Sequence, residues 1–141
     1  MRHSAGVNAL ADCEHITVVA ESERSALASD MVVVGGLGFV SGLRGVDLAN
    51  DRIPIPERVE AQTRKIFANL DQILNAAGIE NREIAFVRIY LVDFERLIER
   101  VNKVYLECLG AGPLPARTIV GVSNVTREAL LEMDFIVRIG A

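Results

Sequence analysis

A segment that opens with two prolines, residues 112–122, constrains the fold of this 141-residue chain more than any other feature. Pro113 and Pro115 each fix their own φ angle and push the preceding residue out of the helical region, so the backbone enters the segment extended. The β-branched residues that follow predict a strand with Arg117 at its start. Because burying an unpartnered arginine is strongly destabilising, Arg117 must either pair with a protein carboxylate or bind an anion. Its planar guanidinium suits a carboxylate or a phosphate.

Two amphipathic segments precede this strand. Between Glu57 and Ala77, apolar residues recur every three or four positions and predict a helix with one apolar face. Pro56 suits the first turn of that helix, and Gly78 suits its C-terminal cap. A second apolar stripe between Leu97 and Cys108 predicts another helix, with Asp93 as its capping residue. Both helices must therefore pack one face against another element.

Apolar and β-branched runs predict strands over residues 15–20, 31–34, 39–42, 84–92, 117–122 and about 131–139. The order is three strands, a helix, a strand, a helix and two strands, without an internal repeat. This order predicts a single α+β domain over residues 1–141, a mixed sheet with two helices packed on one face. Residues 1 to about 14 lack a clear period and are expected to form a loose arm. The uncovered sheet face must meet water or a partner.

Composition narrows the class of protein. Half of the residues are hydrophobic, which is apolar for a chain of this size and favours an oligomer. The net charge is -4 and no Lys/Arg-rich block occurs, so electrostatic nucleic-acid binding is disfavoured. Two distant cysteines, Cys13 and Cys108, predict a reducing cytoplasm and argue against a disulfide framework or a zinc site. No apolar run is long enough for a membrane span, and no secretory signal is expected.

Few residues suggest chemistry. If the last two strands pair antiparallel, Glu132 lies near Arg117, where it either bridges the guanidinium or holds a water beside a bound anion. Asn102 and Tyr105 lie three residues apart on one helix, with solvent exposure and core packing as their default roles. No motif indicates a metal, and no histidine base is suitably placed for a serine nucleophile. A salt-bridged Arg117 and a solvated Glu132 stay open as purely structural interpretations.

The sequence Pro-Ala-Arg-Thr at residues 115–118 resembles the strand start that is the hallmark of the RidA/YjgF family of reactive-intermediate deaminases. Residues 39–42 resemble the Ser-Gly strand end of that family. Residues 60–78 and 101–105 resemble its first and second helices, and Glu132 falls where the family carries its active-site glutamate. These segments occur in the family's order over most of the chain, which is more specific than any single motif.

The resemblance implies a chorismate-mutase-like fold and a homotrimer with active sites between subunits. It also implies an enzyme that hydrolyses 2-imino or 2-enamino acids to 2-oxo acids and ammonia, without a metal or cofactor. Arg117 would clamp the carboxylate of the substrate, and Glu132 would orient the attacking water. The remaining implied substrate-binding residues are Ser41, Gly42, Ile119, Asn102 and Tyr105.

Several positions depart from the family pattern. Its usual Gly-Pro-Tyr segment has no match, and Ala26 to Ala28 stand about there. Leu43 replaces a common glutamine and Ile119 replaces a frequent cysteine, so a divergent paralogue with a more apolar pocket is expected. Two alternatives stay open: a non-catalytic protein that binds or senses small carboxylates such as 2-oxo acids on the same trimeric scaffold, and an RNA-directed activity. The acidic charge balance disfavours the second.

Overall fold

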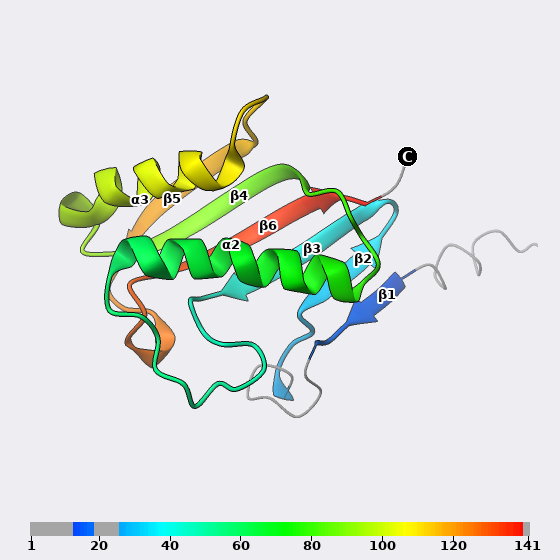
Figure 1. Cartoon of the computed structure of the whole chain (residues 1–141), viewed down its shortest axis with the longest axis horizontal. Helices are drawn as coiled ribbons and strands as arrows, with labels where there is room; N and C mark the ends of the chain where they lie inside the picture. The colour runs from blue at the N-terminus through cyan, green and yellow to red at the C-terminus, as the bar shows by residue number, and fades with distance from the viewer. Residues whose placement is uncertain (1–12, 19–25, 140–141) are drawn as a thin grey trace, which may run out of the picture.

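The computed structural model describes residues 13–18 and 26–139, in which two helices cover one face of a six-stranded sheet (Figure 1). This architecture confirms the α+β prediction. The elements, in chain order, are β1 (Cys13–Ile16), β2 (Met31–Val34), β3 (Leu37–Leu43), α2 (Val59–Ala76), β4 (Glu83–Val92), α3 (Phe94–Leu109), β5 (Ala116–Val122), the 3-10 turn η2 (Thr126–Glu128) and β6 (Leu131–Arg138).

The strand order in the sheet is β1-β2-β3-β6-β4-β5, and every pair is antiparallel except β4 with β5. The parallel pair requires a crossover, and α3 supplies it. The last strand of the chain, β6, therefore lies near the middle of the sheet, between β3 and β4. The expected antiparallel pairing of β5 with β6 is wrong, because β4 separates them.

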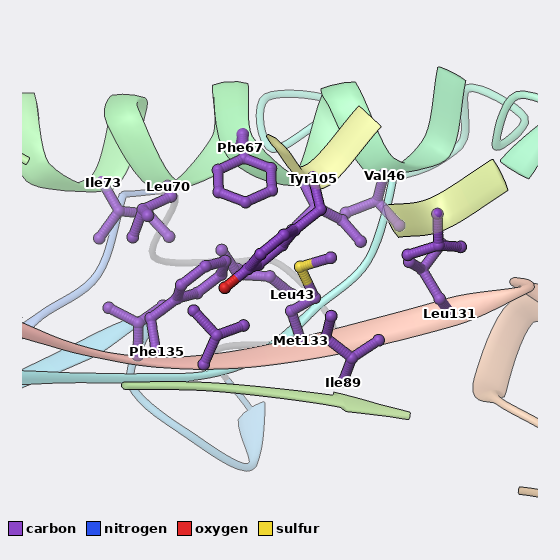
Figure 2. Packing of buried hydrophobic residues seen from close by; sticks show 14 of the residues in the cluster. Leu43, Val46, Phe67, Leu70, Ile73, Ile89, Tyr105, Leu131, Met133 and Phe135 are labelled. Atoms are coloured by element: carbon purple, nitrogen blue, oxygen red, sulfur yellow. The ribbon is translucent and has the colours of Figure 1, made fainter. Parts of the chain in front are cut away.

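The hydrophobic core fills the space between the sheet and the two helices (Figure 2). At its centre the ring of Phe67 on α2 makes edge-to-face contacts with Phe135 on β6, at a centroid distance of 5.6 Å, and with Tyr105 on α3, at 6.2 Å. The two helices are also joined at the surface, where Arg100 donates two hydrogen bonds of 3.0 and 2.8 Å to the carboxylate of Glu60. These contacts fix α3 beside α2, and α3 packs against β4 and β5.

The predicted cap at the end of α2 is confirmed. Gly78 has a φ of +77°, a value that glycine adopts without strain. Its N–H donates to the carbonyl of Asn75 at 3.0 Å, and the N–H of Ile79 donates to the carbonyl of Leu74 at 2.9 Å. This pair of hydrogen bonds is the Schellman arrangement, which satisfies carbonyls that the helix end leaves open.

Both predicted helix starts are wrong in detail. The first helix begins at Val59 with Arg58 at the N-cap, so Pro56 precedes the helix instead of forming its first turn. Asp93 does occupy the N-cap of α3, with a φ of +53°, but its carboxylate caps no helix N–H. It forms an ion pair with Arg96 instead.

The N-terminal predictions hold only in part. Strand β1 starts at Cys13, inside the expected loose arm, because residues 13–16 pair with β2 along its whole length. The expected strand over 15–20 overlaps β1 only at His15 and Ile16; residues 19 and 20, like the first twelve of the arm, lie outside the described residues. Within the described part of the chain, no helix is long and apolar enough to cross a membrane.

The sheet face opposite the helices carries apolar side chains that are well exposed in the single chain. Val34, Leu37, Phe39 and Val120 each leave between 37% and 41% of their surface open to solvent. They alternate with residues on the helix-covered face, since Val40 and Ile89, for example, are buried there. The sequence left open whether the uncovered side of the sheet meets water or a partner, and an exposed apolar face of this kind is typical of an interaction surface.

Candidate functional site

Arg117 lies at the start of β5, on the face that the helices cover. It is the register partner of Val87 on β4, which is fully buried under the helices. Its Nη1 donates to Oδ1 of Asn102 at 2.7 Å, and its guanidinium lies over the ring of Tyr105, 4.8 Å from the ring centroid. Among the described residues Arg117 forms no ion pair, so an amide and an aromatic ring orient its charge without neutralising it. The salt-bridged interpretation therefore loses its support.

Helix α3 supplies both contacts of this arginine because Asn102 and Tyr105 are three residues apart on its sheet-facing side. Asn102 is half-buried and bonded to Arg117, in place of the expected solvent exposure. Tyr105 is buried, as expected, and burial raises the pKa of its hydroxyl. A cavity of about 300 Å³ opens beside them, and its walls also include Leu106, Leu114 and Pro115. An anion bound in this cavity would lie against the Arg117 guanidinium, and the other walls around it would be largely apolar.

Glu132 lies on the other face of the sheet, opposite Tyr90 on β4. It is half-buried and lines a smaller cavity of about 180 Å³. Burial raises the pKa of its carboxyl, the charge of Asp134 raises it further, and the nearby Arg44 lowers it. The other residues around this cavity are Ala28, Ser29, Asp30, Ser41, Gly42, Leu43, Arg44 and Thr126.

A bulge in β3 shapes the wall of this second cavity. The register of β3 with β6 shifts between Val40 and Leu43, and Gly42 in between has a φ of +70°. The N–H of Gly42 donates to Oδ1 of Asp134 at 2.9 Å, while the hydroxyl of Tyr90 donates to Oδ2 at 2.9 Å. Asp134 thus holds the bulge and Ser41 next to Glu132.

Arg44 is a site residue that sequence reasoning missed. Its Nη1 donates to Oγ1 of Thr126 at 2.9 Å, and its backbone carbonyl accepts from Nδ2 of Asn69 at 3.0 Å. Asn69 is fully buried on α2 and also donates to the carbonyl of Val46 at 2.8 Å. One signal was available: an asparagine among the apolar positions of a helix must find backbone partners, and here these lie in the loop that carries Arg44.

The structure separates the residues that were expected to act together. Arg117, Asn102 and Tyr105 line one cavity, while Glu132, Ser41 and Gly42 line another, and the two share no residue. The expected approach of Glu132 to Arg117 is wrong within one chain, because the two residues lie on opposite faces with β4 between their strands.

The remaining predicted site residue, Ile119, lines neither cavity and packs against the core next to Ile89. Across the part of the chain that the structure describes, no three His, Cys, Asp or Glu side chains come together in a group suited to a metal ion.

Comparison with known proteins identifies the family. Residues 23–139 match the family model described as Endoribonuclease L-PSP. The chain therefore belongs to this family, the RidA/YjgF family that its Pro-Ala-Arg-Thr motif resembles. A RutC family protein of Pyrococcus abyssi is 32% identical over 108 residues, which cover 77% of this chain and 83% of the relative. A 2-iminobutanoate/2-iminopropanoate deaminase of Dermatophagoides farinae is 31% identical over 110 residues, with 77% and 83% coverage.

Solved structures support the fold. A protein of the conserved Rid family from Yersinia pestis superposes with a TM-score of 0.76 at 23% identity, covering 89% of this chain and 99% of its own. RidA from an Antarctic Psychrobacter gives a TM-score of 0.72 at 24% identity, with 89% and 94% coverage. The two-helix, six-stranded architecture is therefore the one found in this family.

Proposed function

We propose that this protein hydrolyses 2-imino or 2-enamino acids to 2-oxo acids and ammonia. Family membership and the name of the Dermatophagoides farinae relative support this class of reaction. The observation that carries the proposal is the state of Arg117. Its guanidinium is oriented by Asn102 and Tyr105 and is paired with no carboxylate among the described residues. Such a group is suited to the carboxylate that every 2-imino acid bears.

In the proposed reaction Arg117 binds the substrate carboxylate and fixes the position of the C=N bond. Glu132 accepts a proton from a water molecule as the water oxygen attacks C2, and passes it to the imine nitrogen to give a carbinolamine. The hydroxyl proton of the carbinolamine then passes through Glu132 to the nitrogen while the C–N bond breaks, which releases ammonia and leaves the C2 carbonyl of the 2-oxo acid. Because 2-imino acids are intrinsically reactive, positioning and proton transfer through one carboxyl group suffice for a large acceleration. Burial of Glu132, which raises the pKa of its carboxyl, favours proton transfer near neutral pH.

We further propose that each active site joins two copies of the chain in a homotrimer. Within one chain Arg117 and Glu132 face away from each other, so a shared site needs Arg117 from one subunit and Glu132 from its neighbour. The apolar side chains on the open sheet face, such as Phe39, supply a surface for this association. A head-to-tail contact of this kind closes into a ring when its rotation allows.

The test is release of ammonia from freshly generated 2-iminobutanoate. Glu132→Gln should lower kcat by roughly a hundredfold or more. Arg117→Ala should raise KM roughly ten- to a hundredfold, the value of hydrogen bonds to a charged group. Arg64→Gln is the matched control, because this exposed arginine pairs with Glu107 on the helix layer, and it should leave the rate unchanged.

Two results would overturn the proposal. The first is that the native protein binds 2-oxobutanoate but does not accelerate ammonia release, which would establish the non-catalytic binding alternative. The second is a folded Arg117→Ala variant with native kinetics, which would remove the arginine from the site.

A further inference from the structure

A second group of reactive side chains lies at the other edge of the sheet, on β1. Cys13 and His15 are two residues apart on this strand and project from the same face. The Cys13 Sγ is 3.7 Å from Nε2 of His15, and Nδ1 of the same ring is 3.2 Å from the Ser29 hydroxyl oxygen. The imidazole is thus bracketed by a thiol on one nitrogen and a hydroxyl on the other.

The backbone around this array is fixed by several hydrogen bonds. Strand β1 pairs with β2 so that His15 is opposite Val32. Beyond the strand, the N–H of Asp30 donates to the carbonyl of Ile16 at 2.9 Å, and the carboxylate of Asp30 accepts from the N–H of Val18 at 2.8 Å. These contacts tie the segment that carries Ser29 to the end of β1, so the hydroxyl stays beside the imidazole.

We propose that Cys13 is a nucleophile for small, soft carbon electrophiles, with His15 as its general base and Ser29 as the residue that orients the imidazole. In this arrangement Nδ1–H donates to the Ser29 oxygen, which leaves the Nε2 lone pair directed at the thiol. As sulfur attacks, the S–C bond forms and the thiol proton moves to Nε2. With an alkylating agent the bond from carbon to the leaving group breaks and its electron pair departs with that group. With a conjugated acceptor the C=C electron pair moves to the far carbon, which then takes the proton from Nε2.

The site adjoins the Glu132 cavity without belonging to the proposed hydrolytic machinery. Ser29 takes part in the array and also lines that cavity. A small electrophilic acid that occupies the cavity therefore lies next to the group that orients the base. The proposal does not rest on the deaminase activity, because Cys13, His15 and Ser29 would promote alkylation of the Cys13 sulfur and take no part in C=N hydrolysis.

The second cysteine of the chain provides an internal comparison. Cys108 is half-buried on α3, and burial raises the pKa of its thiol, an effect that the charges of Arg82 and Arg64 only partly oppose. In the single chain Cys13 is exposed, at the edge strand of the open sheet face beside its register partner Val34, and it has a base at its sulfur. A buried thiol such as that of Cys108 is a slow nucleophile. The two cysteines thus differ in whether a histidine base lies next to the thiol, and Cys108 serves as the reference within the same protein sample.

The experiment is limited alkylation of the native assembly with iodoacetamide at neutral pH, with the rate at each cysteine followed by peptide mass spectrometry. In the native protein Cys13 should react at least about tenfold faster than Cys108. His15→Gln and His15→Asn, which keep a polar side chain but remove the base, should each slow Cys13 by about tenfold or more, within the usual range of general-base catalysis. Ser29→Ala should slow Cys13 less, and Cys108 should react at the native rate in all three variants.

The proposal is wrong if Cys13 in folded His15→Gln and His15→Asn proteins reacts at the native rate. It is equally wrong if Cys13 in the native assembly reacts no faster than Cys108. Ammonia release from 2-iminobutanoate, measured on the same samples, separates this result from the proposed deaminase function, since either activity can be present without the other.

Discussion

Asn69 is a buried polar residue whose loss should weaken this fold, through the loop that carries Arg44. Its side-chain amide is fully buried and donates to two backbone carbonyls, those of Arg44 and Val46. These carbonyls lie in the irregular segment between β3 and α2. Asn69→Ala removes both hydrogen bonds and takes this donor away from the buried carbonyl of Val46.

The size of the effect follows from these contacts. Each neutral hydrogen bond contributes about 1 kcal/mol, and each buried group left unpaired costs about 1–3 kcal/mol. Two terms oppose this loss. Oδ1 of Asn69 is itself buried without a partner, so its removal costs nothing, and alanine gains roughly half a kcal/mol of helix propensity. We therefore expect Asn69→Ala to lower the free energy of unfolding by about 3 kcal/mol, which corresponds to roughly 10 °C in Tm for a chain of this length.

The assay is chemical and thermal unfolding of both proteins at one fixed protein concentration, so that any oligomer contributes equally. Asn75→Ala is the matched control, because Asn75 is an exposed asparagine on the same helix, and it should change the stability by less than about 0.5 kcal/mol. An Asn69→Ala protein as stable as the Asn75→Ala control would refute the reasoning, since the two hydrogen bonds of the amide would then contribute nothing to the free energy of unfolding.

Two further predictions concern the charged groups of the two cavities. Because Glu132 must be ionised to accept a proton, activity should fall as the pH drops through its raised pKa; Arg44→Gln removes a charge that lowers this pKa, so the acidic limb of the kcat profile should move to higher pH. An unmoved limb would show that Arg44 does not act on Glu132. Asn102→Asp places a carboxylate against Arg117 and should compete with the substrate, raising KM by roughly tenfold or more, whereas an unchanged KM would argue against carboxylate binding at Arg117.

Local patterns were enough to find most elements of the fold. The periodicity between Glu57 and Ala77 and the glycine at position 78 place one helix and its end to within two residues. Asp93 could not be resolved in this way, since it stands at the N-cap in a left-handed conformation and its side chain turns to Arg96. Which neighbour a capping side chain selects depends on backbone angles that a sequence pattern does not specify.

The site was harder to predict because it depends on which strands are neighbours. Pairing β5 with β6 followed from their closeness in sequence, but one helix between β4 and β5 is the connection that a parallel pair requires. That single choice decides whether Arg117 and Glu132 share a face. Arg44 was missed for a related reason: it reaches the Glu132 cavity through a loop that a buried amide on α2 holds in place.

The most direct test of the two-subunit active site is a mixing experiment with two variants of low activity, assayed at a substrate concentration below the native KM. Arg117→Ala and Glu132→Gln proteins are each assayed alone for ammonia release, and then after they are unfolded together in equal amounts and refolded. If Arg117 of one subunit acts with Glu132 of its neighbour, random assembly into a closed ring restores an intact pair at about a quarter of the sites, so the mixture should regain about a quarter of the native activity. A mixture as inactive as its two components, with assembly confirmed by its mass in solution, would contradict the shared site.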